Sequence, residues 1–270
     1  MTILRGSCAQ NGVPDDPLWK EYWEIADDIF DLIDVITGSV YSVDDEPTAE
    51  EIDTIIKEMS ANKSSFGSLS IDLAKLGGVK VSNFIYRCIL VCFQRNDIPD
   101  ALRKEKMVLL LKSRGVIDNI NDYRGIFLRN VIVSVYQKWL YIKNSQKVDD
   151  AGSEFACGGR KGRSVNDPLL VVKLIQDYAK WTKKETILKF LDVEKFFDSM
   201  NYKLALIEAY KNGVDGRYWQ CYKTLNAKKS CIPFIPSGSL TPIDVNNVFV
   251  QGSCDAGRIR PNRYSVPSAR

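Results

Sequence analysis

The sequence of 270 residues contains no histidine. Histidine is the usual general base of serine and cysteine hydrolases, and its imidazole is the commonest side-chain ligand of metals in proteins. Its absence excludes Ser-His-Asp catalysis, Cys-His catalysis and every metal site that depends on histidine. The chemistry of this chain must come from other side chains.

Cysteine pairs and long apolar runs are missing as well. The seven cysteines form no Cys-x-x-Cys pair and their number is odd, so we expect reduced thiols, no zinc site and an intracellular protein, either nuclear or cytoplasmic. Cys88 and Cys92 stand at helical spacing in an apolar segment, which favours core packing.

No apolar run is long enough to span a bilayer, and the N-terminus has no signal-peptide core. We therefore expect a soluble protein without a membrane partner.

Acidic and basic residues nearly balance. The 37 Lys and Arg against 34 Asp and Glu give a formal net charge of +3, too small to indicate a nucleic-acid partner, so any basic surface must come from local clustering. A hydrophobic content of 45% is enough for a sizeable core in one domain or two lobes.

Hydrophobic periodicity predicts a mixed α/β (α+β) fold. Thr48 and Glu51 form a capping box ahead of apolar residues at helical spacing, which predicts a helix over 49–60. Further helices are predicted over 19–36, 82–94, 131–141, 202–212 and 217–226. Short apolar runs predict strands over 107–111, 122–128, 187–191, 231–235 and 245–250.

Another helix is predicted from Pro168 onward. Asp167 is its expected N-cap, because Pro is favoured in the first turn, where no backbone N–H is needed. We expect this helix to be buried on one side, formed by Leu169, Leu170, Val172, Ile175 and Tyr178.

The stretch 186–198 joins a predicted strand to acidic residues. The apolar run Ile187 to Leu191 ends at Asp192, and Phe197 and Asp198 follow in a helix-like segment. A buried strand that delivers a carboxylate at its C-terminal end holds a metal ion rigidly, which makes Asp192 a candidate metal ligand. The same pattern, with Asp198 capping a helix, also occurs in α/β proteins that bind no metal.

Basic residues occur in two further segments. The strand over 107–111 delivers Lys112, and the next strand carries Arg124. A glycine-rich loop holds Arg160, Lys161 and Arg163 at a spacing that does not fit a Walker A loop. Its charges suit a nucleic-acid backbone. A solvated hairpin and a solvated loop are the alternatives.

Taken in order, these segments resemble the reverse transcriptase domain of non-LTR, LINE-type retrotransposons. The resemblance covers residues 48–257. Four pieces carry it: Asp192 to Asp198 as motif A, the strands around Lys112 and Tyr123-Arg-Gly-Ile126, the loop Gly158 to Ser164, and Gln251-Gly252 as motif B. Gly125 departs from the proline that most reverse transcriptase families have at this place.

The resemblance implies an incomplete right-hand polymerase that performs RNA-directed DNA synthesis. It implies an N-terminal helical extension over 1–47, a fingers-like region over 48–180, a partial palm over 181–257 and an atypical basic tail over 258–270. The implied partners are an RNA template, a DNA primer and deoxynucleotides, and the implied metal is Mg²⁺.

The resemblance also assigns roles to residues. Asp192 would ligate the metal with help from the carbonyl of Val193, and Phe197 would exclude a 2′-hydroxyl as a steric gate. Lys112 and Arg124 would bind the triphosphate. Gln251 and Gly252 would position the nucleotide and the template strand. Arg160, Lys161 and Arg163 would follow the template backbone.

One part of the family pattern is missing. Two-metal nucleotidyl transfer uses the motif A aspartate and an Asp-Asp pair that follows motif B, but no Asp-Asp pair follows Gln251 in this sequence. The pairs Asp44-Asp45 and Asp149-Asp150 precede Asp192 and are predicted to be loop acids. We therefore expect an incomplete magnesium site and no turnover. The alternatives are a non-catalytic nucleic-acid-binding remnant and an unrelated α/β scaffold.

Overall fold

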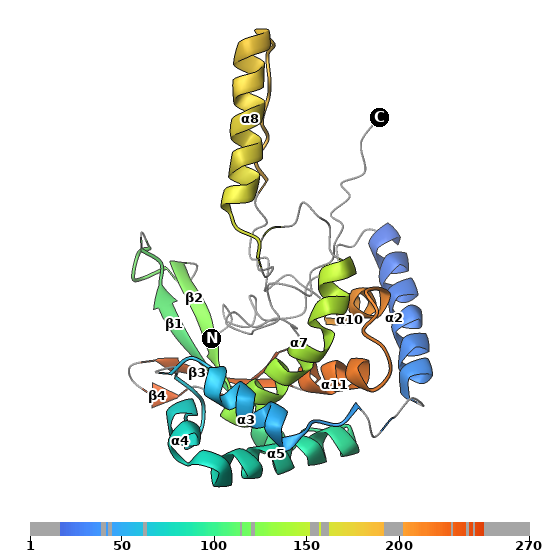
Figure 1. Ribbon diagram of the computed structural model, residues 1–270, viewed down its shortest axis with the longest axis vertical. Helices are drawn as coiled ribbons and strands as arrows, with labels where there is room; N and C mark the ends of the chain where they lie inside the picture. The colour runs from blue at the N-terminus through green and yellow to red at the C-terminus, as the bar shows by residue number, and fades with distance from the viewer. Residues whose placement is uncertain are drawn as a thin grey trace.

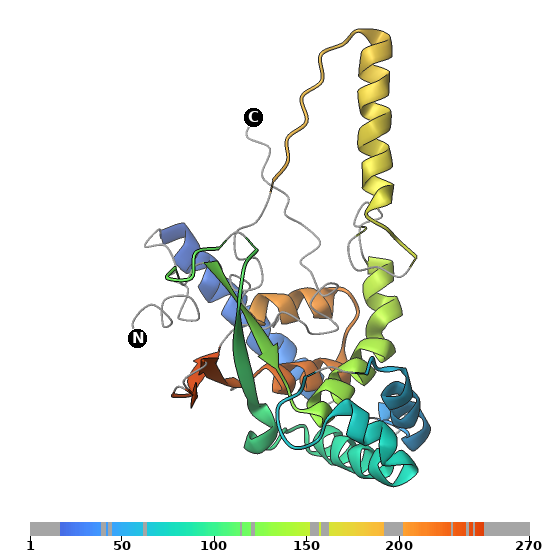
Figure 2. The ribbon, with the colours of Figure 1, turned by 90° about the vertical axis from the view of Figure 1, so that its left-hand side faces the viewer.

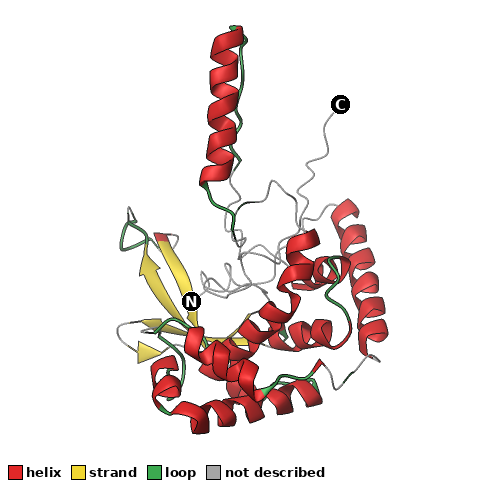
Figure 3. Cartoon of the chain, in the orientation of Figure 1, coloured by secondary structure: helices red, strands yellow, loops and turns green. Residues whose placement is uncertain are grey.

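The computed structural model describes residues 17–38, 42, 45–61, 64–113, 115–119, 122–151, 157, 162–191, 202–227, 229–235, 238–239 and 241–245. Helices and a small mixed sheet form a body, and one long helix, α8, stands away from it (Figure 1). Figure 3 shows the strands gathered at one edge of the helical body. The fold class is mixed α+β, as the periodicity predicts.

Six helices of the body lie close to their predicted positions: α2 (Pro17–Gly38), α3 (Ala49–Glu58), α5 (Gly78–Arg95), α7 (Val131–Ala151), α10 (Tyr202–Lys211) and α11 (Gly216–Asn226). Two short helices were not predicted, α4 (Ile71–Leu76) and α6 (Asp100–Arg103). The largest difference is in α7, which continues well past residue 141. Asp149 and Asp150 therefore lie on the end of a helix, and their predicted place in a loop is wrong.

The core of the body surrounds α7. The Trp139 side chain is 1% exposed, and its ring lies 5.5 Å from that of Phe93 on α5 and 5.9 Å from that of Tyr218 on α11, between ring centroids. Aromatic side chains bury large apolar areas, and edge-on or tilted pairs at this separation add further stabilisation. Trp139 thus joins three helices that lie far apart in the sequence.

The predicted capping box at the start of α3 is confirmed, and it also connects α3 to α7. The backbone N–H of Glu51 donates to the Thr48 hydroxyl (3.2 Å), and the Glu51 carboxylate accepts from the Thr48 N–H (3.1 Å). The same carboxylate accepts from the indole N–H of Trp139 (2.9 Å) and pairs with Lys143 (2.5 Å). One acidic side chain therefore caps one helix and holds another against it.

Helix α2 packs against α10 and α11. The Gln220 amide of α11 donates to the backbone carbonyl of Asp34 (3.0 Å), the Asp34 carboxylate (2.7 Å) and the Thr37 hydroxyl (2.9 Å). Lys223 pairs with the same carboxylate. The predicted N-terminal helix is therefore joined to the body by polar contacts as well as by buried Phe30 and Ile33.

The sheet is centred on β1 (Lys104–Leu111), which pairs antiparallel with β2 (Tyr123–Leu128) and parallel with β3 (Lys229–Ile235). Strand β3 also pairs antiparallel with β4 (Gly238–Ser239) and β5 (Ile243–Val245). The predicted strands over 107–111, 122–128 and 231–235 are confirmed. Residues 246–250 of the last predicted strand lie outside the described residues.

Arg103 fixes the point where β1 and β3 start side by side. Its guanidinium donates to the carbonyls of Thr224 and Ala227 at the end of α11, both at 2.9 Å, and to Ile98 (2.8 Å). It also pairs with Asp97 at 2.5 Å. Because α11 leads directly into β3, this arginine aligns two strands from distant parts of the chain.

Helix α8 (Asn166–Thr182) and residues 184–191 form an arm that projects from the body (Figure 2). The helix is present, but its predicted burial is wrong: Leu169, Leu170 and Tyr178 are more than half exposed, and Ile175 is 40% exposed. Helical hydrogen bonds form locally, whereas burial needs a partner surface. No other described helix or strand makes an extensive contact with α8.

The start of α8 also differs from the prediction. Val165 occupies the N-cap position and makes no side-chain capping bond. The Asp167 carboxylate instead accepts a hydrogen bond from the Ser164 backbone N–H at 2.9 Å. Asp167 therefore stabilises the turn that leads into the helix from inside its first turn.

Candidate nucleotide and nucleic-acid interface

The hairpin of β1 and β2 presents the two residues predicted to bind a triphosphate. Its loop is folded around Asp122, whose carboxylate accepts from the Val116 N–H (2.9 Å) and the Asn119 amide (3.2 Å). The Tyr123 hydroxyl donates to the Ile117 carbonyl at 2.9 Å. Local side-chain bonds of this kind define a loop conformation, so the strand ends on either side are held in register.

Lys112 and Arg124 share one face of the hairpin. The register pairs Leu110 with Arg124, and the Lys112 N–H donates to the Asp122 carbonyl at 2.8 Å, which continues the ladder by one step. Opposite residues point to the same face, and diagonal neighbours two residues along lie within reach of long side chains. Both residues are exposed. The structure thus brings together two cations that lie twelve positions apart in the sequence.

The base of the hairpin is anchored on its other face. Arg129 and Glu105 form an ion pair with 2.5 Å between Nε and Oε1, and their side chains are 9% and 6% exposed. Arg129 also donates to Gln137 of α7, and its carbonyl accepts from the Phe66 N–H at 2.9 Å. A buried ion pair with these extra hydrogen bonds ties both strands to α7. The loop end of the hairpin therefore extends from a fixed base.

Two further cations lie on the same face as Lys112. Lys104 and Lys106 alternate with inward residues along β1, and the Lys106 ammonium lies 3.6 Å from the centroid of the Phe234 ring on β3. The predicted strand started at Met107, so these lysines were not placed on it. We call Lys104, Lys106, Lys112 and Arg124 the basic hairpin face.

The glycine-rich loop is described only in part. Arg163 is exposed and follows Gly162, whose φ of +74° is a left-handed conformation that favours glycine. Arg160 and Lys161 lie outside the described residues. Nucleic-acid binding by this loop therefore stays a prediction.

The stretch predicted to carry the metal ligand begins without a strand. Residues 187–191 adopt no regular secondary structure, and Ile187, Phe190 and Leu191 are 95%, 80% and 71% exposed. The predicted buried strand is wrong here: none of the described strands pairs with this run, so neither its backbone nor its side chains are covered by the sheet. Asp192, Val193 and Phe197 lie outside the described residues, as do Gln251 and Gly252.

The described residues do not place metal-binding acids together. Within them, no group of three or more Asp, Glu, Cys or His side chains has the arrangement to hold a metal ion. Magnesium is therefore a prediction that depends on Asp192. Among the described helices, none combines the length and apolar character that crossing a bilayer requires.

Comparison with known proteins adds no family assignment. Neither protein-family models nor curated proteins give a match to this chain. The case for any function therefore depends on the residues and their geometry.

Proposed function

We propose that this chain carries the fingers and part of the palm of an RNA-directed DNA polymerase of the LINE type. In this proposal Lys112 and Arg124 bind the triphosphate of a deoxynucleotide, and the basic hairpin face contacts nucleic acid. The 270 residues alone bind these partners without extending a primer, because they hold one of the three carboxylates that two-metal transfer uses in the family.

The shared face of Lys112 and Arg124 is the observation that carries the proposal. A triphosphate bears several negative charges close together, and two cations that are diagonal neighbours can bind adjacent phosphate groups. Arginine supplies a planar fork for two oxygens, and lysine supplies a compact charge. The opposite arrangement, with one residue on each face, would have been incompatible with a common ligand.

In this proposal Asp192 is the one side chain that would bind magnesium. The ion would neutralise phosphate charge when bound, and Val193 would assist with its carbonyl. Because no Asp-Asp pair follows Gln251 in the sequence, the proposal assigns this chain binding and not turnover.

A non-catalytic nucleic-acid-binding remnant is the second candidate. The basic hairpin face favours it independently of any metal, because four cations flank exposed apolar sheet surface that includes Leu110 at 52% exposure. The two candidates differ in the ligand. The first requires a triphosphate site, and the second requires only a phosphate backbone.

The experiment is a titration of the chain with a fluorescent deoxynucleoside triphosphate in Mg²⁺. We expect Arg124→Ala to weaken binding about tenfold or more, since hydrogen bonds to charged groups contribute about 1.5–3 kcal/mol and 1.4 kcal/mol is tenfold. Lys80→Ala, which removes an exposed lysine of α5, serves as the control and should leave binding unchanged. Equal affinities for the two variants would rule out the hairpin as the triphosphate site.

A primer-extension assay tests the absence of turnover. We expect no extension of a primed RNA template with Mg²⁺ and deoxynucleotides, because loss of metal ligands removes several kcal/mol of transition-state stabilisation and each 1.36 kcal/mol is tenfold in rate. Extension that Asp192→Asn abolishes would show that the missing carboxylates are supplied from elsewhere in these 270 residues.

A further inference from the structure

The tip of the arm concentrates positive charge around an exposed tryptophan. Residues 180–189 contain four lysines and one glutamate, a surplus of three charges that equals the formal net charge of +3 of the whole chain. Trp181, in the last turn of α8, is 81% exposed. Its ring lies 6.2 Å from that of Tyr178, which is 58% exposed, with 55° between the ring planes.

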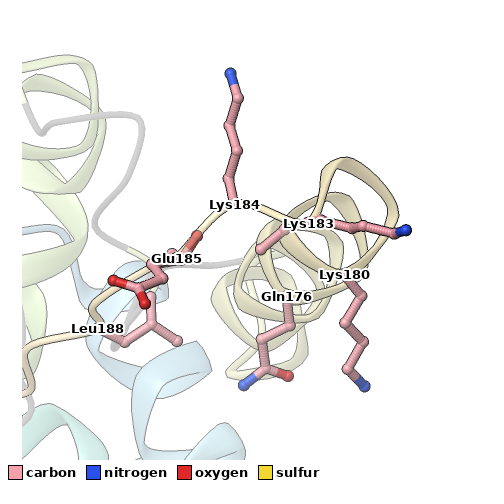
Figure 4. A pocket seen from close by; sticks show the side chains of 8 residues that line it. Gln176, Lys180, Lys183, Lys184, Glu185 and Leu188 are labelled. Atoms are coloured by element: carbon pink, nitrogen blue, oxygen red, sulfur yellow. The ribbon is translucent and has the colours of Figure 1, made fainter.

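The lysines at the tip are directed outward. The last turns of α8 and the returning segment border an open hollow of about 520 Å³, whose lining includes Gln176, Lys180, Lys183, Lys184, Glu185 and Leu188 (Figure 4). In Figure 4, the side chains of Lys180, Lys183 and Lys184 extend away from Glu185. No ion pair within the described residues joins these lysines to an acid.

We propose that the arm tip is a contact site for single-stranded nucleic acid, in which Trp181 stacks on a base and Lys180, Lys183 and Lys184 contact the phosphates on either side. The inference rests on the proposed function in taking nucleic acid as the partner, and it places the contact outside the residues that the family resemblance assigns. A single strand fits because its bases offer free faces, whereas the bases of a duplex are already stacked.

The position of the lysines alone has a simpler structural reason. Cations at the C-terminal end of a helix are stabilised by the helix dipole, and the Lys183 N–H caps α8 by donating to the carbonyls of Ala179 and Lys180. This accounts for the charges but not for the aromatic side chain. A tryptophan left 81% exposed loses most of the free energy that its burial would provide.

A lipid surface or a second copy of the chain would contact α8 differently from nucleic acid. Leu170 and Leu174, which are 59% and 58% exposed, lie nearer the body, whereas the aromatic rings lie beside the lysines at the tip. An anionic lipid surface or a second copy of the chain would bury the aliphatic residues as well. Nucleic acid needs only the tip.

The test measures binding of a labelled 20-nucleotide oligouridylate to the full chain by fluorescence anisotropy. We expect Trp181→Leu to weaken binding about tenfold, in the range found for loss of one base-aromatic stack, and Trp181→Phe to retain most of it. An aromatic requirement distinguishes stacking from general apolar contact. Because the side chain is exposed, both variants should unfold at the wild-type temperature, which circular dichroism checks.

Salt dependence tests the phosphate contacts. Lys184→Glu should reduce the slope of log affinity against log salt by about 0.7, the contribution of one phosphate contact to a single strand. Lys80→Glu makes the same change in net charge on α5 and should leave the slope nearly unchanged.

Two results would overturn the inference. The first is unchanged oligouridylate affinity in Trp181→Leu and Lys184→Glu. The second is a Trp181 effect on another partner in place of oligouridylate. In that case Trp181→Leu would reduce binding to vesicles of phosphatidylserine and phosphatidylcholine, or self-association in sedimentation equilibrium, and would leave oligouridylate binding unchanged. The triphosphate titration separates this inference from the proposed function: tip-dependent RNA binding without triphosphate binding would remove the proposed function alone. Triphosphate binding without a tip effect would remove the inference alone.

Discussion

Helices α3 and α8 have similar amphipathic sequences but different surroundings. In α3, the apolar residues Ile52, Ile55 and Ile56 are at most 4% exposed, because α5 and α7 pack on them. In α8, residues at equivalent helical spacing, Leu174 and Tyr178, are both 58% exposed. A repeat of apolar residues therefore predicts a helix in both cases but does not decide whether a partner surface is present.

Two of the apolar runs predicted as strands, 231–235 and 187–191, differ in the same way. The run 231–235 lies in β3, where it pairs with β1 and leaves Cys231 2% exposed. The run 187–191 adopts no regular structure, and Ile187 is 95% exposed. A strand forms only where an apolar run meets a partner strand, and of these two runs only the first pairs with a described strand.

Hydrogen exchange should give the largest contrast between the body and the arm. Amides in the middle of α7 should exchange only on global unfolding, with an opening free energy on the order of 5 kcal/mol or more. Amides of α8 should open at about 0–1 kcal/mol, because little packing holds that helix. Mass spectrometry of peptides from 133–145 and 168–181 checks this. Equal protection of the two peptides would mean that the arm is packed in solution.

Truncation of one tryptophan in each region sharpens the contrast. Trp139→Ala should destabilise the chain by about 3–5 kcal/mol, the usual cost of removing a large buried aromatic side chain. Trp181→Ala should change stability by less than about 0.5 kcal/mol, as surface substitutions usually do. Urea unfolding followed by circular dichroism gives both values. A large loss in Trp181→Ala would show that its ring is buried.

The contribution of Glu51 to the pH dependence of stability should be a smaller effect than either of these contrasts. Burial by itself raises the pKa of Glu51, but hydrogen bonds from Lys143, Trp139 and the Thr48 N–H outweigh it and hold the pKa below its ordinary value of 4.5. The unfolded chain then binds this proton more readily than the folded chain does. The stabilisation is therefore present above about pH 4.5 and is lost as the pH falls through the folded-state pKa.

Thermal unfolding of the wild type and Glu51→Gln between pH 7 and pH 3.5 measures this effect. Glutamine keeps the capping geometry but has no titrating group, so the variant should lose less stability on acidification. Parallel pH profiles for the two proteins would assign the acid sensitivity to other carboxylates.

Local sequence patterns predicted those parts of the fold that depend on residues close together in the sequence. The capping box at Thr48 and Glu51 and the apolar spacing of α3 depend on neighbouring residues, and so does the hairpin of β1 and β2. The parallel pairing of β1 with β3 joins segments more than 100 residues apart, and its alignment through Arg103 has no local signal.

The residues of the candidate site were also predictable where the signal was local, and not where it depended on packing. Lys112 and Arg124 were identified from the strands that carry them, and the register adds that they share a face. The position of Lys104 and Lys106 on β1 was not predicted, because the apolar run that marked the strand starts after them. The exposure of Trp181 could not be predicted, because the sequence pattern favours burial of that side of α8.

A double-mutant cycle on triphosphate affinity tests the central claim most directly. Lys112→Ala, Arg124→Ala and the double variant are titrated with the same deoxynucleoside triphosphate in Mg²⁺. If both cations bind one triphosphate, the losses should be non-additive, with a coupling energy of about 0.5 kcal/mol or more. Losses that add within about 0.3 kcal/mol, or variants that bind like the wild type, would contradict the assignment of the basic hairpin face as a nucleotide site.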